Sequence, residues 1–478
     1  MLNTKQKIAL NVGIKGGGKL AIIIISIIST AVLTRLLGQK GYGQYTIALN
    51  FAQMIGVFSE LGLATTLLRS ISQKDSKEST AATNILSLRL LSGVAFFVFT
   101  PFLALLFPYE KIVIIAIAIA ALSTFCSVIQ QSLSSIFQKK LSIWQAVSIE
   151  TSGRIITVIG IVIAANFQQG LITIITIIST VNLLQMIALV ILANHYIPLK
   201  ISYDLTIWKT TIKDAWPFAV IQILQLVYLR GDIIILSLLS TSSQVGLYGA
   251  AYRVLDAVSS IPPLFIGLAA PLVTFDWSRG DINGLSRKMA HSFRFLGLLA
   301  IPLVFGALAL SNELMMFVAG QNFASAGLLL KILMFSVIGI YWRALYMLAI
   351  VALGLQKKLI KAFITNALLS LLFYLILIPL YGGIGAALVT IFSEFFSAMV
   401  CTIVISKNIG FRPNLLLLLK IVLASLIMLV ILLTLPDINV IYKIIVGGAI
   451  YAISILALGG VSIQNLKSLF IVNQFNNE

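Results

Sequence analysis

Residues 362–380 read AFITNALLSLLFYLILIPL, a run of apolar and small polar side chains without a single charge. A helix formed by such a run can cross a bilayer, whose hydrocarbon core requires about 20 predominantly apolar residues. Comparable runs occur at 11–35, 43–68, 83–107, 112–137, 147–166, 170–194, 214–240, 246–275, 289–311, 324–353, 362–380, 383–406, 414–435 and 440–463. The sequence therefore predicts an all-α, polytopic membrane protein of about fourteen transmembrane helices.

The composition excludes a water-soluble protein. Hydrophobic residues make up 59% of the 478 residues, charged residues only 10%, and the mean hydropathy is +1.06. Soluble domains carry about 25% charged residues. The net charge of +18 does not indicate nucleic acid, because the basic residues are scattered between apolar runs. The two cysteines, Cys126 and Cys401, lie within apolar runs and provide neither a disulfide framework nor a metal site.

The distribution of basic residues orients the predicted spans. With the N-terminus in the cytoplasm, 22 of the 33 Lys and Arg residues lie on the cytoplasmic side and 4 lie on the outer side. The positive-inside rule describes this asymmetry for short loops, and one missed span would invert every later loop. We therefore expect a multi-pass protein of the cytoplasmic membrane with both termini in the cytoplasm.

The connections between the spans are too short for a soluble domain. A glycan polymerase usually carries its chemistry on a large outer loop, and an ATP-driven exporter needs a nucleotide-binding domain. The string Gly13–Lys19 has the spacing of a phosphate-binding loop, but Leu20 stands where Ser or Thr is required and no strand precedes it. We interpret this string as a basic, flexible entry to the first helix. We expect a transporter, not an enzyme, and no cofactor.

Two halves of the chain resemble each other. The segment 43–48 (GQYTIA) is matched by 246–251 (GLYGAA), and 138–140 (QKK) is matched by 356–358 (QKK). An even number of predicted spans separates the partners, so both halves have the same orientation. Transporters commonly place the substrate path between such halves. Chance similarity between Gly-rich helix ends is the alternative. The repeat predicts a six-helix lobe at 1–200, a second lobe at 201–411, and two additional helices with a cytoplasmic tail at 412–478.

Ionisable residues inside the predicted spans are the candidate functional residues. Such residues are costly in a bilayer and usually face a bundle interior or a water-filled cavity. The candidates for a cationic substrate cavity are Arg230, Arg343, Arg253, Lys331, Arg154 and Arg89. A surplus of cations attracts an anionic ligand, and the Arg fork binds two phosphate oxygens at once. We expect the deep residues Arg230 and Arg343 to line the cavity.

Part of this set has a simpler explanation. Glu150 and Arg154 are spaced i, i+4, and Arg253 and Asp256 are spaced i, i+3, so each pair can form a purely structural ion pair on one helix face. Arg89 lies close to a cytoplasmic helix end, where its side chain can reach the interface.

The intramembrane carboxylates suggest coupling to an ion gradient. A buried Asp or Glu can take up a proton or sodium ion on one side of the membrane and release it on the other. A charge that crosses 100 mV yields about 2.3 kcal/mol. The coupling candidates are Asp232, Asp256 and Glu394, followed by Glu60 and Glu150. No residue cluster indicates a bound metal.

Three groups of motifs occur in a fixed order over nearly the whole chain. They are TRLLG (34–38) with GYGQY (41–45), RGD (230–232) with VGLYGAAYR (245–253), and GLQKK (354–358) with IPLYGGIGAA (378–387) and SE (393–394). With these gaps, the chain resembles the polysaccharide-precursor flippases. These are the O-antigen and capsule repeat-unit transporters of the multidrug/oligosaccharidyl-lipid/polysaccharide exporter superfamily.

The resemblance implies two six-helix lobes that form a V around a cationic cavity, and ion-coupled alternating access. It implies an undecaprenyl-diphosphate-linked oligosaccharide as cargo in a bacterial cytoplasmic membrane, with a glycan polymerase and a chain-length regulator as candidate partners. Many relatives have twelve spans, whereas lipid II flippases of the same superfamily have fourteen. A lipid II flippase and a cation-coupled multidrug or metabolite exporter are therefore the alternatives.

Overall fold

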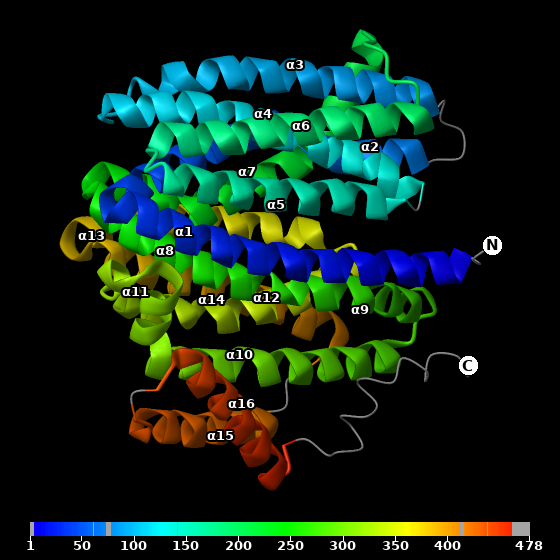
Figure 1. Ribbon diagram of the computed structural model, residues 1–478. Helices are drawn as coiled ribbons and strands as arrows, with labels where there is room; N and C mark the ends of the chain where they lie inside the picture. The colour runs from blue at the N-terminus through cyan, green and yellow to red at the C-terminus, as the bar shows by residue number, and fades with distance from the viewer. Residues whose placement is uncertain are drawn as a thin grey trace. The chain divides into compact units, whose positions relative to one another are not determined.

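A computed structural model of the protein describes residues 4–60, 62–72, 78–140, 142–411, 415–436 and 438–460 (Figure 1). The regular elements within these ranges are helices only, which confirms the predicted fold class. The predicted cytoplasmic tail beyond residue 460 lies outside the described residues. The elements are α1 (Thr4–Glu60), α2 (Leu63–Ser72), α3 (Glu78–Ala104), α4 (Lys111–Lys139), α5 (Ile143–Asn166), α6 (Leu171–Tyr196), α7 (Leu205–Leu239), α8 (Ser242–Ser259), α9 (Ile261–Ser278), α10 (Ile282–Ala319), η1 (Gln321–Phe323), α11 (Ala326–Met334), α12 (Ser336–Ala352), η2 (Gln356–Leu359), α13 (Ile360–Tyr381), α14 (Gly383–Ile409), α15 (Leu415–Thr434) and α16 (Val440–Ala457).

Eleven helical stretches of the described chain are long and apolar enough to span a membrane. The first, Gly17–Glu60, covers most of the first two predicted spans, and Gly38 (φ 62°, ψ −174°) interrupts the helical backbone between them. Glycine adopts this conformation readily because it has no Cβ atom. The second predicted span, 43–68, extends into α2. The seventh predicted span lies in α7, and the eighth is divided between α8 and α9. The helices thus account for the predicted set of spans.

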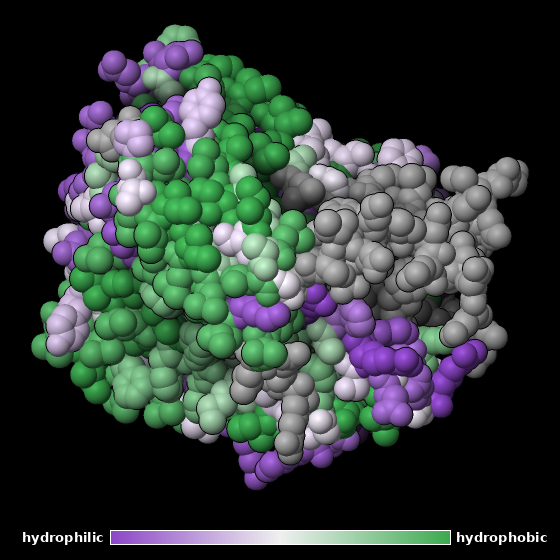
Figure 2. Space-filling view, turned by 90° about the horizontal axis from the view of Figure 1, so that it is seen from below, coloured by the Kyte–Doolittle hydropathy of each residue, from purple (hydrophilic) through white to green (hydrophobic). Residues whose placement is uncertain are grey.

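Apolar side chains cover much of the outside of the protein. Many Leu, Ile and Phe side chains on α3, α5, α13 and α16 are exposed, among them Phe102, Ile163 and Ile453. Figure 2 shows a face on which apolar residues predominate. Soluble monomers rarely expose large contiguous apolar patches. Such a surface is suited to contact with lipid chains.

The chain divides into two compact units, each described by itself. Unit 1 comprises Met1–Arg253, Val318–Phe323 and Phe363–Thr390, and unit 2 comprises Val254–Phe317, Ala324–Ala362 and Ile391–Glu478. In unit 1, α4 packs against α1, α3 and α6. Branched and aromatic side chains of α2, α3, α4 and α6 form a core. This scaffold fixes the helices around the cavity described below.

In unit 2, α15 and α16 dock on α10. Two apolar clusters join the three helices. Lys443 Nζ on α16 lies 2.8 Å from Glu313 Oε1 on α10, and the Lys443 side chain is almost fully buried. The Tyr451 hydroxyl donates a hydrogen bond to the carbonyl oxygen of Leu298 at 3.0 Å. The two additional helices are therefore held on α10 by polar as well as apolar contacts.

Candidate functional site

Unit 1 contains a partly open, polar cavity of about 190 Å³. Side chains of α1, α4, α5, α6 and α8 line it, including Arg154, Arg253 and several hydroxyl and amide groups. None of the described lining residues is acidic. The cavity, which we call the unit 1 cavity, is therefore positively charged. Its volume is below the roughly 300–1,000 Å³ of ordinary small-molecule sites, so in this state it has room for only part of a large cargo.

Arg154 supplies one of the two charges. It lies exposed on α5 and makes no hydrogen bond or ion pair with another described residue. Glu150, one turn earlier on α5, is also exposed and forms no ion pair with Arg154. The structural pair that the i, i+4 spacing allows is thus not formed. The guanidinium, which can only donate hydrogen bonds, therefore has no acceptor among the described residues.

Arg253, on α8, supplies the second charge. It interacts with the hydroxyl groups of Tyr42 and Tyr45 on α1. Both tyrosines are buried, and their ring centroids lie 5.6 Å apart. Both contacts are with neutral hydroxyl groups, and they help to position the Arg253 guanidinium. The two arginines come from helices far apart in the sequence, and packing within unit 1 brings both to one space.

The structure places Arg230, Arg343 and Lys331 in other environments. The Arg230 guanidinium lies over the Tyr252 ring, 5.1 Å from its centroid, and does not line the unit 1 cavity. Arg343 belongs to unit 2, where its Nε lies 2.9 Å from Glu394 Oε2 and its Nη2 lies 3.4 Å from Glu394 Oε1. Lys331 is half-buried on α11 of unit 2.

Arg89 is fully buried and acts on the protein backbone. Its Nη1 donates to the carbonyl oxygen of Glu60 at 2.6 Å, and its Nη2 donates to that of Val128 at 3.0 Å. Glu60 is the last residue of α1, where helical carbonyl groups lack partners. Arg89 therefore caps the break between α1 and α2 instead of reaching an interface or the cavity.

Among the acidic candidates, Asp232 is the most completely enclosed in unit 1. Its side chain is fully buried and accepts hydrogen bonds from the Tyr248 hydroxyl at 2.6 Å and from the Ile233 amide at 2.7 Å. The Tyr248 hydroxyl also lies 3.3 Å from Thr390 Oγ1. This chain of polar groups links α7, α8 and α14.

The other carboxylates differ in their surroundings. Glu394 is paired with Arg343, and its side chain is only 1% exposed. Glu60 accepts a long hydrogen bond from Gln222, at 3.4 Å. Asp256 is half-buried on α8. Of these groups, the Asp232 carboxylate belongs to a hydrogen-bond chain that joins three helices of unit 1.

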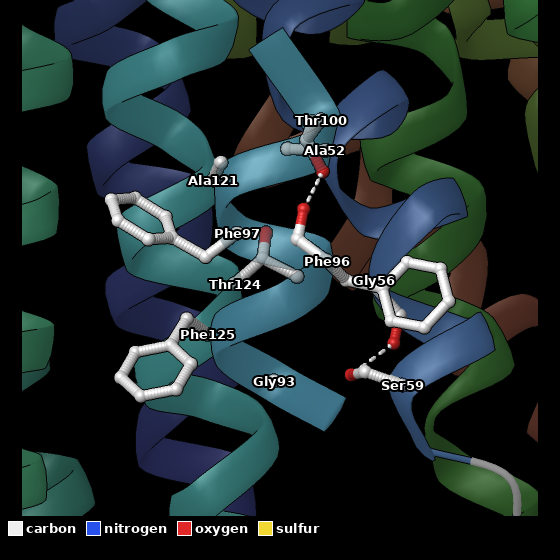
Figure 3. A pocket seen from close by; sticks show the side chains of 10 residues that line it. All are labelled: Ala52, Gly56, Ser59, Gly93, Phe96, Phe97, Thr100, Ala121, Thr124 and Phe125. Atoms are coloured by element: carbon white, nitrogen blue, oxygen red, sulfur yellow. Dashed lines mark hydrogen bonds between the residues drawn. The ribbon is translucent and has the colours of Figure 1, made fainter. Parts of the chain in front are cut away.

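A second pocket in unit 1 is too small for a substrate. Figure 3 shows it between α1, α3 and α4, and its volume is about 10 Å³. This is about the space of one water molecule. Two of its hydroxyl groups donate hydrogen bonds to carbonyl oxygens of their own helices (Figure 3). Ser59 donates to Gly56 O at 2.7 Å, and Thr100 donates to Phe96 O at 2.6 Å.

Sequence reasoning based on charge missed the neutral groups of the site. Tyr42, Tyr45, Asn182 and Gln185 line the unit 1 cavity, and Tyr248 holds Asp232. Neutral polar residues are common in transmembrane helices, so their type alone gives no signal. The internal repeat did contain a signal, because it aligns Tyr45 with Tyr248. In the structure, both tyrosines contact a charged candidate residue.

These features define a class: polytopic helical membrane proteins with a cationic internal cavity. Residues 8–272, more than half of the chain, match the model of the family described as polysaccharide biosynthesis protein. The chain belongs to this family, as its sequence motifs led us to expect.

Two curated relatives come from Haloferax volcanii. "Probable flippase AglR" is 24% identical over 185 residues, 38% of this chain and 39% of that protein. "Probable low-salt glycan biosynthesis flippase Agl15" is 30% identical over 167 residues, 34% of each chain. The chain thus spans little more than a third of the length of the curated relatives that it matches.

Solved transporter structures share the fold. The lipid II flippase MurJ in an inward closed conformation superimposes with a TM-score of 0.76 at 16% identity, over 93% of this chain and 98% of that one. An inward-facing MATE family multidrug resistance transporter superimposes with a TM-score of 0.65 at 11% identity, over 82% and 94% of the two chains. At these identities the likeness extends to the fold alone.

Proposed function

We propose that this protein is a flippase that moves a lipid-linked, anionic glycan precursor from the cytoplasmic to the outer leaflet of a bacterial cytoplasmic membrane. The observation that carries the proposal is the unit 1 cavity, where Arg154 and Arg253 face a space that no acidic residue of the described chain lines. Excess cation in a low-dielectric cavity attracts anions strongly, and arginine binds phosphate through paired hydrogen bonds. A polyprenyl diphosphate supplies that anion.

The cargo class follows from the family and its relatives. The polysaccharide biosynthesis family and the flippases AglR and Agl15 support a lipid-linked glycan. We assign the chain an undecaprenyl-diphosphate-linked repeat unit of an O-antigen, capsule or exopolysaccharide, with both termini of the chain in the cytoplasm. A glycan polymerase and a chain-length regulator are the partners that such a product requires.

Ion coupling is part of the proposal, with Asp232 as the coupling group. Its carboxylate is buried, and Tyr248 and Thr390 connect it to two other helices. Binding of a proton or sodium ion at this carboxylate changes hydrogen bonds on three helices at once. One charge moving through 100 mV provides about 2.3 kcal/mol for the conformational cycle.

A small-molecule exporter is the second candidate, because a MATE family transporter shares the fold. The lining of the unit 1 cavity argues against a cationic drug, which two arginines would repel. The two candidates differ in what accumulates when the protein is absent.

Mass spectrometry of lipid-linked glycans in cells that lack the gene separates the candidates. We expect one polyprenyl-diphosphate oligosaccharide to accumulate in the cytoplasmic leaflet, with loss of the matching surface glycan. An unchanged lipid profile with normal surface glycan, together with altered drug sensitivity, would favour the exporter.

Complementation then connects the function to the cavity. Arg154→Gln should leave the glycolipid accumulated, and Arg154→Lys should restore part of the surface glycan, because it keeps the charge and loses the fork. Arg279→Gln is the matched control, since Arg279 stacks on Phe275 and does not line the cavity. Full complementation by Arg154→Gln at normal expression would remove Arg154 from the substrate site.

A further inference from the structure

The unit 1 cavity contains hydrogen-bond acceptors that the anionic part of a cargo cannot use. Arg154 and Arg253 only donate hydrogen bonds. The amide side chains of Asn182 and Gln185 on α6 also line the cavity. The hydrogen bonds that these amides already make determine which of their atoms is left for a ligand.

Both N–H donors of the Asn182 side chain are used in hydrogen bonds within the protein. Its Nδ2 donates to Ser123 Oγ at 3.0 Å and to the carbonyl oxygen of Ile178 at 2.9 Å. No described residue donates a hydrogen bond to its Oδ1. A primary amide has two N–H donors and one carbonyl acceptor, so the group that Asn182 can offer is the acceptor.

The Gln185 amide is also oriented by its donors, and it packs closely against α5. Its Nε2 donates to the carbonyl oxygens of Ile149 at 2.9 Å and Glu150 at 3.1 Å on α5. The amide fits there because position 153 is glycine: a Cβ atom on Gly153 would lie 2.0 Å from Nε2. The side chain is 9% exposed. No described residue donates to Oε1, so this oxygen too is an acceptor available to a ligand.

The ligand that matches both sets of groups is a phosphorylated sugar. An ionised diphosphate carries acceptors only, so it satisfies the arginines and leaves the amide oxygens without donors. Sugar hydroxyl groups and acetamido N–H groups are donors. We propose that Asn182 and Gln185 recognise the sugar next to the diphosphate through its O–H or N–H groups, while the arginines hold the diphosphate. This inference rests on the proposed flippase function and assigns the specificity of its site.

Binding of two defined probes to the purified full-length protein in nanodiscs tests the inference. The probes are farnesyl diphosphate and farnesyl diphosphate that carries one N-acetylhexosamine. The wild type should bind the glycosylated probe at least about tenfold more tightly, since one hydrogen bond contributes about this factor. Asn182→Leu with Gln185→Leu should abolish the difference and keep the affinity for the bare diphosphate.

Two further variants isolate the recognition step. Gly153→Ala should also reduce the preference, because the new methyl group displaces the Gln185 amide from α5. Gln145→Leu is the matched control, since Gln145 lies on α5, accepts a hydrogen bond from Tyr196 and does not line the cavity. It should keep the full preference.

The outcomes separate this inference from the function on which it rests. Equal wild-type affinity for the two probes overturns sugar recognition at this site and leaves the flippase intact. Absence of binding of either probe, or binding that is unaffected by Arg154→Gln, contradicts the proposed function. The affinities of the wild type for the two probes test sugar recognition even where the double variant fails to fold.

Discussion

Gly43 in α1 and Gly246 in α8 lie back to back where their helices cross. A Cβ atom on Gly43 would lie 1.7 Å from the carbonyl oxygen of Ser242, and one on Gly246 would lie 2.1 Å from that of Gln39. The sequence repeat equates Gly43 with Gly246, and the same interval separates Gln39 from Ser242. Both contacts therefore have the same form, as expected when two repeats meet about a local twofold axis. Small residues allow such close approach of backbones in membranes.

The first prediction concerns this crossing. Gly43→Ala should lower the free energy of unfolding by about 1–3 kcal/mol, as overpacking does, because the methyl group would overlap a backbone carbonyl and not a movable side chain. Gly448→Ala on α16, where no atom lies within 4 Å of the added Cβ, should be neutral or slightly stabilising. Thermal unfolding of the purified variants measures both. Equal stability of the two variants would contradict the close crossing.

The apolar spans of the fold could be predicted from sequence, and the helix breaks inside them could not. Apolar runs located the spans because a bilayer imposes the same length on each. The break at Gly38 falls in the predicted gap between the runs 11–35 and 43–68. The breaks between α1 and α2 and between α8 and α9 fall inside the runs 43–68 and 246–275, so hydropathy does not mark them. The motif at Gly13–Lys19, interpreted as a flexible entry, lies within the helical backbone of α1.

The candidate site was only partly accessible to the same reasoning. Charge inside a span drew attention to Arg154 and Arg253, which line one cavity. The roles of Arg89 and Arg343 depend on partners that lie 39 and 51 residues away in the chain, Val128 and Glu394. A single sequence does not show such long-range contacts, so it cannot separate a capping or paired arginine from one that faces a cavity.

The second prediction concerns the pair between Arg343 and Glu394. Glu394→Gln should destabilise the protein by about 3–5 kcal/mol, because it leaves a largely buried guanidinium without its counter-charge. Arg343→Met combined with Glu394→Leu should be much less costly, since neither charge remains. Glu110→Gln, which breaks the exposed Lys40 pair, should cost less than about 1 kcal/mol. Denaturant unfolding of the variants measures these costs, and a Glu394→Gln variant as stable as the wild type would contradict the pairing.

The third prediction concerns Arg89. Arg89→Lys should lower stability by about 1–3 kcal/mol, because one ammonium group cannot replace the fork that serves the Glu60 and Val128 carbonyl oxygens. Affinity for farnesyl diphosphate should be unchanged in the folded fraction, since Arg89 does not line the cavity. Arg154→Lys should have the opposite pattern, with weaker binding and wild-type stability. Loss of binding at unchanged stability in the Arg89 variant would place Arg89 in the substrate site.

The last prediction concerns coupling through Asp232. Asp232→Asn keeps the shape of the side chain and removes its charge, so transport should no longer respond to an imposed proton or sodium gradient. One coupled charge at 100 mV corresponds to about 2.3 kcal/mol, or a roughly 50-fold bias in the transport equilibrium. Tyr248→Phe should weaken the response, because it removes the hydrogen bond between α8 and the carboxylate. Glu150→Gln, at an exposed position of α5, is the control and should respond as the wild type does. Proteoliposomes with a fluorescent glycolipid measure the bias, and a normal response of Asp232→Asn would move the coupling site to another carboxylate.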